Sequence, residues 1–466
     1  MSLRYELFKS WNNREGTINS MSDIYSWINE KNSTAKVSVN KIDFPNKNGI
    51  WFYDEDSGCI RNKDHSFFQI VGFQVYREGG GLIEEQPLMK QAEIGYLGII
   101  CKKINGILNF LMQVKIEPGN INCVQISPTI QATKSNFTRK HGGNSPAYLD
   151  YFINARDHSI LVDQIQSEQS SRFYKKRNRN IVILVEDDIE VLDSHKWMTL
   201  GQIKELLKID NLVNMDTRTV LSGLPLGVGD IQLEERREIQ SCIKDDALFK
   251  SFFEDITYLN TIPVYNAAND YKMFSDKENR IVALKDLKSW EYKKDEIISK
   301  NHDHSFKVIY CDVTIDGREV RHWEQPMVES TGMALFGLFT MVIDGVRKYL
   351  ITIKNEIGCF DIAEMGPSVQ IESTKHPSNY DQVETLFMKK WKNNSGVLKD
   401  IILSEEGGRF YHEQNYNVII DISKEELDNL PNGYFWESYS TLNYLSQINN
   451  VLNIQLRNLL TLIEIS

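Results

Sequence analysis

The chain has 466 residues, of which 41% are hydrophobic and 11% aromatic, so it can bury substantial cores and is not a disordered polymer. Lys and Arg number 53 against 64 Asp and Glu, which gives a formal net charge of −11. Because nucleic-acid affinity comes largely from cations that neutralise phosphates, this balance argues against a nucleic-acid-binding protein and leaves room only for a local basic pocket. Length alone suggests about three domains.

Membrane and secretion signals are not evident in the sequence. The longest nearly apolar run, 335–343, is far shorter than the roughly twenty residues of a bilayer span. The N-terminal segment lacks the apolar core of a secretion signal, so we expect a cytoplasmic protein with no membrane contact. The six cysteines are scattered without a CxxC pair, which favours free buried thiols over zinc ligands or disulfides.

The two halves of the chain repeat one pattern at an offset of 239 residues. The matched pairs include Trp51 and Trp290, Gly98 and Gly337, Lys115 and Lys354, Glu117 and Glu356, and Arg218 and Arg457. This period is too long for a solenoid built from units of 20 to 50 residues. We therefore interpret the chain as two tandem copies of one domain, 1–235 and 236–466, joined by a charged connector.

Within the first copy, strand signals precede helix signals. Asn105-Gly106 lies between two apolar runs, a pattern typical of a β-hairpin, and the run at 107–116 is rich in β-branched and aromatic residues. Apolar residues then recur at helical spacing over 203–221. The second copy repeats each of these features 239 residues later. The sequence thus predicts an α+β fold of mixed sheets with helices packed on them.

Several common cofactor motifs are absent. No GxGxxG follows a strand and no GxxxxGK[ST] occurs, so neither a dinucleotide fold nor a P-loop is indicated. No HExxH and no cysteine-histidine cluster suggests a metal site. We expect a protein that needs no cofactor.

Charged residues recur on the best-matched strands. Lys115 and Glu117 alternate with apolar residues, so the period of two places both on one face of a strand, and Lys354 and Glu356 repeat the arrangement. These pairs are equally consistent with a structural ion pair and with a functional site.

A polar segment follows the strand pair of the first copy. Its hydroxyl, amide and cationic side chains suit phosphate and sugar oxygens. These side chains belong to Thr133, Lys134, Ser135 and Asn136, and Phe137 follows them. The alternative is a solvated loop.

A third cluster pairs small residues with an arginine in each copy. Ser170 and Arg172 correspond to Gly407 and Arg409, with Gly408 between the latter two. Small residues allow a ligand to approach the backbone while the guanidinium holds an anion. The alternative is a turn capped by a surface arginine. Likewise, the matched tryptophans either stack on a base or sugar or belong to the core.

At these motifs the chain resembles the NDP-hexose 2,3-dehydratase family. The motifs are EPGNINCVQISPTIQATKSNFTRKHGG, QSEQSSRFYKKRNRNIVIL and NLVNMDTRTVLSGL in the first copy, and HWEQPMV, EMGPSVQIE and EEGGRFYHE in the second. The resemblance implies two Nudix-like domains in each subunit, a homodimer, and no need for a metal or nicotinamide. It also implies loss of water across carbons 2 and 3 of dTDP-4-dehydro-6-deoxy-D-glucose. The product, dTDP-3,4-didehydro-2,6-dideoxy-D-glucose, would pass to a 3-ketoreductase or an aminotransferase.

The two copies differ where acid/base chemistry needs carboxylates. Glu364 and Glu372 of the second copy stand where the first has Gln125 and Thr133, so we place the site mainly in the second copy. The acid/base candidates are Glu356, Glu372 and Glu406, with Lys354 or a tyrosine as stabiliser of the enolate. The substrate-binding candidates are Trp51, Thr133, Lys134, Ser135, Asn136, Phe137, Ser170, Arg172, Trp290, Gly366, Pro367, Ser368, Gln370, Gly407, Gly408 and Arg409.

Two other functions compete with the dehydratase. One is a non-catalytic nucleotide-sugar-binding protein. The other is a Nudix-type hydrolase, which is disfavoured because no glutamate-rich REUxEExGU box occurs. In each case a diphosphate needs local cations, and Lys134, Arg172 and Arg409 are the expected ones.

Overall fold

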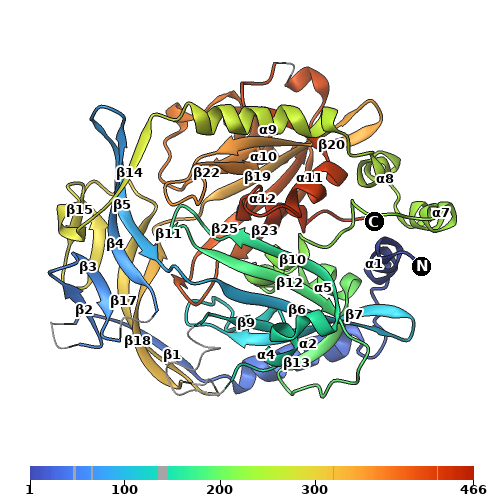
Figure 1. Ribbon diagram of the computed structural model, residues 1–466, viewed down its shortest axis with the longest axis horizontal. Helices are drawn as coiled ribbons and strands as arrows, with labels where there is room; N and C mark the ends of the chain where they lie inside the picture. Colours follow the sequence, from blue (N-terminus) through green and yellow to red (C-terminus); the bar gives the residue numbers. More distant parts are fainter. Residues whose placement is uncertain (46–48, 65–66, 135–144, 318–319, 428, 466) are drawn as a thin grey trace.

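Figure 1 shows a computed structural model that describes residues 1–45, 49–64, 67–134, 145–317, 320–427 and 429–465. The elements of the first half are α1 (Leu3–Asn12), α2 (Met21–Thr34), β1 (Val37–Ile42), β2 (Trp51–Asp54), β3 (Cys59–Asn62), β4 (Gln69–Arg77), β5 (Leu82–Lys90), β6 (Gly95–Ile104), β7 (Ile107–Ile116), β8 (Val124–Ser127), β9 (Ile130–Ala132), α4 (Leu149–Ile153), β10 (Ser159–Ser167), β11 (Phe173–Tyr174), β12 (Arg177–Leu184), β13 (His195–Thr199), α5 (Leu200–Leu206) and α6 (Met215–Leu221). Helix α7 (Leu233–Cys242) follows.

The second half repeats this order. Its elements are α8 (Asp246–Phe253), α9 (Tyr258–Met273), β14 (Lys277–Val282), β15 (Trp290–Tyr292), β16 (Glu296–Ser299), β17 (Phe306–Ile315), β18 (His322–Ser330), β19 (Leu335–Ile343), β20 (Val346–Lys354), β21 (Glu364–Pro367), β22 (Val369–Ile371), α10 (Gln382–Lys392), β23 (Val397–Ser404), β24 (Phe410–Tyr411), β25 (Gln414–Asp421), β26 (Tyr434–Ser438), α11 (Tyr439–Ser446) and α12 (Ile454–Leu460). The predicted α+β fold with mixed sheets and packed helices is confirmed.

Each half contains one seven-stranded sheet. In the first half, strands β10, β12, β6, β7 and β13 form its main path, with β8 beside β7 and β9 beside β6. In the second half, β23, β25, β19 and β20 follow in the same order, with β26 and β21 beside β20 and β22 beside β19. The two larger sheets lie to the right of the smaller ones in Figure 1.

The two smaller sheets exchange strands between the halves. Strand β1 of the first half pairs antiparallel with β17 of the second, and β14 of the second half pairs antiparallel with β4 of the first. One hydrophobic cluster, which includes Trp51 and Trp290, joins these sheets. The predicted boundary at 235/236 falls inside α7 and stays a prediction, but the exchange shows that the halves are interlocked on both sides of it.

Turn chemistry explains the hairpins of the large sheets. Asn105 and Gly106 have φ values of 50° and 78°, and Asp344 and Gly345 have 52° and 77°. Two consecutive positive φ values match the right-handed twist of paired strands, and Asn-Gly and Asp-Gly adopt them readily. Strands β6 and β7 pair across the first turn and β19 and β20 across the second, so both predicted hairpins are confirmed.

The predicted C-terminal helical pattern of each copy is split into two short helices. Between α5 and α6 the chain turns at Asn211, whose φ is 57°, and the Asn214 side chain then caps α6 by accepting from Thr217 N at 2.8 Å. These helices bury their apolar faces in one cluster shared by both halves. Its members include Leu206, Val220, Leu442 and Leu459, all fully buried. None of the described helices is long and apolar enough to cross a membrane.

Candidate active site

A cavity of about 400 Å³ lies between the large sheet of the first half and segments of the second half. The first half contributes residues that follow β7, β9 and β11, among them Glu117, Thr133 and Lys176. The second half contributes strand β18 and the loop between β23 and β24, which carries Glu406 and Arg409. Neither half alone therefore encloses the cavity.

Close backbone contacts hold the β23–β24 loop against the first half. Gly119 N donates to Gly407 O at 2.7 Å, and His412 N donates to Gly119 O at 3.0 Å. A Cβ added at Gly407 would lie 2.2 Å from Asn120 Oδ1 and 2.9 Å from Glu117 Cβ. Gly407 thus lacks a side chain because the two halves approach each other here, and this approach places Glu406 in the cavity.

Carboxyl groups in unequal environments line the cavity. Glu406 Oε1 accepts from Gly408 N at 2.7 Å, and burial together with the neighbouring Glu117 raises the pKa of Glu406 to about 7. Glu117 Oε1 forms an ion pair with Lys115 Nζ at 3.0 Å. The predicted Lys115–Glu117 pair is therefore an ion pair, and it also lies in the cavity wall.

Two cations complete the polar lining. The Arg409 guanidinium lies 4.6 Å from the centroid of the Phe68 ring, and its Nη1 donates to Gly408 O at 3.0 Å. Within the described residues, Arg409 forms no ion pair with a carboxylate. Lys176 Nζ donates to Glu93 O at 2.9 Å, and burial lowers the pKa of this ammonium group. Both cations thus lie in the cavity wall with the acidic groups, and the charge of Arg409 acts on Glu406.

A second cluster occupies the equivalent position in the second half. Gln370 Nε2 donates to Glu356 Oε1 at 2.8 Å, and burial raises the pKa of Glu356 to about 7. Burial also lowers the pKa of Lys354. Lys354 is the last residue of strand β20, and Glu356 follows two residues later. Lys354 and Glu356 thus repeat Lys115 and Glu117 of the cavity wall.

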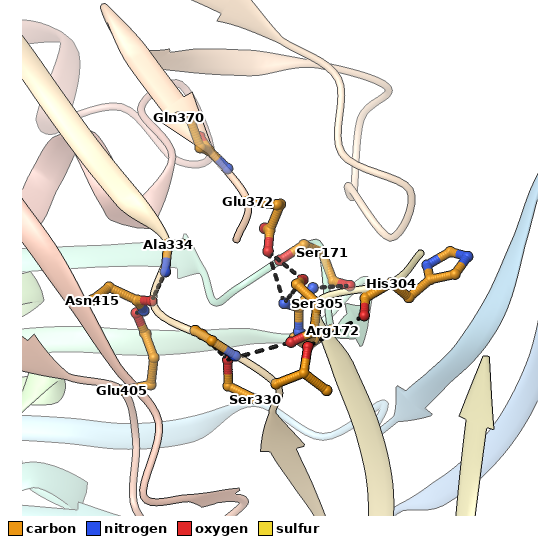
Figure 2. A network of polar contacts seen from close by, with 12 residues as sticks. Ser171, Arg172, His304, Ser305, Ser330, Ala334, Gln370, Glu372, Glu405 and Asn415 are labelled. Atoms are coloured by element: carbon orange, nitrogen blue, oxygen red, sulfur yellow. Dashed lines mark hydrogen bonds and ion pairs between the residues drawn. The ribbon is translucent and has the colours of Figure 1, made fainter. Parts of the chain in front are cut away.

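The arginine of the second cluster is bound by the protein itself, as Figure 2 shows. Arg172 Nη2 lies 3.1 Å from Glu372 Oε2 and donates to Ser305 Oγ at 2.9 Å, while Ser305 donates to the same carboxylate. Burial alone would raise the pKa of Glu372, but the charge of Arg172 and these hydrogen bonds bring it below its ordinary value. Glu372 therefore occupies the side of Arg172 that a ligand anion would need.

The predicted site residues divide between these two places. Those that line the cavity are Trp51, Thr133, Glu406, Gly408 and Arg409, with Gly407 directly behind them. Those of the second cluster are Arg172, Lys354, Glu356, Gln370 and Glu372, with Ser170 in the loop that carries Arg172. The cavity lining thus brings Glu406, Gly408 and Arg409 together with Thr133 and includes neither Trp290 nor Gln370.

The other predicted residues have structural contacts or lie elsewhere. Ser368 Oγ donates to Leu350 O at 2.5 Å, and Trp290 Nε1 donates to Glu85 O at 2.9 Å from within the core. Gly366 and Pro367 belong to strand β21. Lys134 is exposed next to Thr133. The predicted residues Ser135, Asn136 and Phe137 lie outside the described residues.

The sequence prediction missed several groups of the cavity. They are Asp216, Glu168, Lys176 and Trp323. A signal existed for Asp216, because the 239-residue offset pairs it with Gln455 and so marks a carboxyl group that only the first copy has. Glu168 and Lys176 gave no such signal, because their approach to Glu406 depends on how the halves dock.

A polar cavity that combines titratable carboxyl groups with cations is suited to acid/base chemistry on an anionic ligand. A family model described as NDP-hexose 2,3-dehydratase matches residues 21–224 and 262–463, once in each half. The chain belongs to this family. No group of three or more His, Cys, Asp or Glu side chains within the described ranges is arranged to hold a metal ion.

Curated relatives cover nearly the whole chain. A protein of Saccharopolyspora spinosa named dTDP-4-dehydro-6-deoxy-alpha-D-glucopyranose 2,3-dehydratase is 35% identical over 94% of this chain and 90% of its own length. A Streptomyces violaceoruber protein of the same name is 33% identical over 96% of this chain and 98% of its own. A third, from Amycolatopsis orientalis, is 32% identical over 95% of this chain and 90% of its own.

Proposed function

We propose that this chain removes water across carbons 2 and 3 of dTDP-4-dehydro-6-deoxy-D-glucose and that the reaction takes place in the cavity between its halves. The observation that carries the proposal is the position of Glu406, a carboxyl group with its pKa raised to about 7, inside a cavity that also holds Arg409. The names of the full-length relatives supply the substrate and the reaction.

The chemistry needs a base rather than a redox cofactor. The 4-keto group acidifies the hydrogen on carbon 3, so a carboxylate can remove it once the charge that develops on the keto oxygen is stabilised. Glu406 is the proposed base, because a carboxylate whose pKa lies near neutrality is both ionised in part and more basic than an exposed glutamate. Lys115 and Lys176 are the cations in the cavity wall that can stabilise the enolate oxygen.

The substrate's diphosphate is the natural partner of Arg409. A guanidinium binds phosphate oxygens through parallel N–H donors, and Arg409 forms no ion pair with a carboxylate in the described part of the chain. Thr133 lies in the same wall and carries a hydroxyl, and Trp51, which is largely buried in the core, also borders the cavity. In the second cluster the equivalent Arg172 already contacts Glu372, which is the reason for placing catalysis in the cavity between the halves.

We further propose that each half is a Nudix-like domain, that the chain forms a homodimer, and that it works in the cytoplasm. The repeated mixed sheet with helices packed on it supports the first proposal. Light scattering of the purified chain tests the second. The unstable diketone product requires a following reaction, for which a 3-ketoreductase or an aminotransferase is the proposed partner.

The deciding experiment compares the wild-type chain with Glu406→Gln on dTDP-4-dehydro-6-deoxy-D-glucose. A 3-ketoreductase and NADPH trap the product, which mass spectrometry detects as a reduced sugar that has lost one water molecule. We expect product with the wild type and a fall of about 100-fold or more with Glu406→Gln at unchanged dTDP affinity. Glu278→Gln, on an exposed edge strand, is the matched control.

Two outcomes would replace the proposal. Binding of dTDP-sugar by the wild type without any dehydrated product would favour the non-catalytic binding protein. Magnesium-dependent release of dTMP from the same substrate would favour the hydrolase.

A further inference from the structure

The two carboxyl clusters differ at positions that matter for proton transfer. Both clusters keep a Lys near the end of a central strand, a Glu just after that strand and a Gln on a following short strand. These residues are Lys115, Glu117 and Gln131 in the first cluster and Lys354, Glu356 and Gln370 in the second. Both also keep an acidic residue in a loop between two strands. It is Glu168, between β10 and β11, in the first cluster and Glu405, between β23 and β24, in the second. These shared groups form a common frame.

Two carboxyl groups of the cavity are replaced by amides in the second cluster. Glu406 corresponds to Gln169, since Arg409 and Arg172 follow them at the same spacing. Asp216 corresponds to Gln455 at the offset of 239 residues. The cavity thus holds two proton-transferring groups where the second cluster holds two groups that cannot release or accept a proton at neutral pH.

Asp216 is buried and faces the cavity. It lies in α6, its exposed fraction is 2%, and it belongs to the cavity lining. Within the described residues its Oδ1 has no hydrogen-bond partner. Since a buried carboxyl oxygen without a partner costs free energy, a ligand group in the cavity that hydrogen-bonds to this carboxyl would lower that cost.

We propose that Asp216 is the acid that protonates the departing hydroxyl on carbon 2, opposite in role to the base Glu406. This inference rests on the proposed dehydratase function and adds a second catalytic residue to it.

The protons balance over the elimination. Glu406 accepts the proton from carbon 3, and the electron pair of that C–H bond forms the enolate. The enolate then forms the double bond between carbons 2 and 3 as the C2–O bond breaks, and the Asp216 proton goes to the leaving oxygen to give water. Tautomerisation of the resulting enol adds a proton to carbon 2 and releases one from the hydroxyl on carbon 3, which restores both carboxyl groups.

The surroundings of Asp216 favour its protonated form. Burial raises its pKa well above the ordinary value, and the nearby Glu406, Glu168 and Glu117 raise it further, whereas Lys115 opposes them. Arg218 on the same helix is a further charged neighbour of Asp216. A raised pKa favours the protonated form, which is the form that a general acid needs.

The two chemical steps can be separated by an isotope experiment in D₂O. Asp216→Asn is expected to exchange the hydrogen on carbon 3 of recovered substrate for deuterium while its dehydration rate falls by about 100-fold or more. Glu406→Gln is expected to catalyse neither exchange nor dehydration. Gln455→Asn, the matched control at the equivalent position, is expected to dehydrate at the wild-type rate. Affinity for dTDP, measured by calorimetry, establishes that each variant is folded.

Other results would overturn the assignment. Wild-type dehydration by Asp216→Asn, or loss of exchange together with dehydration at unchanged dTDP affinity, would remove Asp216 as the acid. If the wild type itself forms no product, the proposed dehydratase function is wrong, and the role of Asp216 as the acid falls with it.

A measurement on the wild type avoids any folding defect of the variant. With rising pH, dehydration should decline as Asp216 loses its proton, while deuterium exchange into recovered substrate should continue to rise. A parallel rise or fall of both rates over the whole range would contradict the proposal.

Discussion

Replacing Glu372 by Thr, the residue at the equivalent position of the first half, tests whether the second cluster is structural. Thr removes the carboxylate that lies 3.1 Å from Arg172 Nη2 and leaves Ser305 as the side chain that still hydrogen-bonds to this guanidinium among the described residues. Arg172 is 6% exposed, so its charge loses its main compensation within the protein. We therefore expect Glu372→Thr to destabilise the fold and to leave dehydration intact.

The magnitude follows from burial. Breaking a fully buried ion pair costs about 3–5 kcal/mol, and hydrogen bonds to charged groups contribute about 1.5–3 kcal/mol. Because the side chain of Glu372 is 35% exposed, water can partly replace the carboxylate, so we expect a loss of about 1–3 kcal/mol in the free energy of unfolding. The pKa of Glu372 is lowered in the folded state, so this stabilisation is present above the ordinary pKa near 4.5 and is lost as pH falls below it.

Urea unfolding at pH 7 and at pH 4, together with the dehydration assay, measures both effects. Glu278→Thr is the control, because Glu278 pairs with Arg280 on the surface and should change stability by less than about 0.5 kcal/mol. The difference between Glu372→Thr and the wild type should shrink at pH 4. Unchanged stability combined with a 100-fold or greater loss of dehydration would contradict a structural role for Glu372 and would restore it as a catalyst.

Three further predictions concern the cavity and the sheet beside it. Arg409→Lys should weaken dTDP binding roughly 10- to 100-fold in calorimetry, because lysine lacks the paired N–H donors that bind phosphate. Arg172→Lys should change the dTDP affinity little. Equal effects of the two substitutions would contradict the placement of the diphosphate at Arg409. Gly407→Val should cost about 1–3 kcal/mol in urea unfolding and slow dehydration, since its Cβ would meet Asn120 at 2.2 Å, and wild-type behaviour would show that the loop can move aside. Burial lowers the pKa of His195 from 6.5 to about 4, so the unfolded state takes up a proton first as pH falls. Between pH 6.5 and 4 the wild type should therefore lose about 3 kcal/mol more stability than His195→Gln, and identical pH profiles would contradict this.

Local structure was predictable where a residue type has few conformational choices. Asn105-Gly106 and Asp344-Gly345 both adopt the positive φ values that the hairpin needs, and the sequence alone located these turns. The exchange of β1 and β14 between the halves was not predictable, because a strand's own pattern does not specify which distant edge it pairs with.

The site was predictable in its parts and not in its assembly. The loop of Glu406 and Arg409 was identified from its small residues and charges, but its place depends on the contact of Gly407 with Gly119, which joins the two halves. The extra carboxylate Glu372 looked catalytic by residue type alone. Its contact with Arg172 crosses between the halves, and sequence patterns carry no information on that contact.

The most direct test of the proposed active site is a crystal structure of the chain with a dTDP-sugar that cannot eliminate water. We expect the diphosphate to lie against Arg409 and carbon 3 of the sugar to face Glu406 in the cavity between the halves. A ligand bound beside Arg172 and Glu372, with none in that cavity, would contradict it.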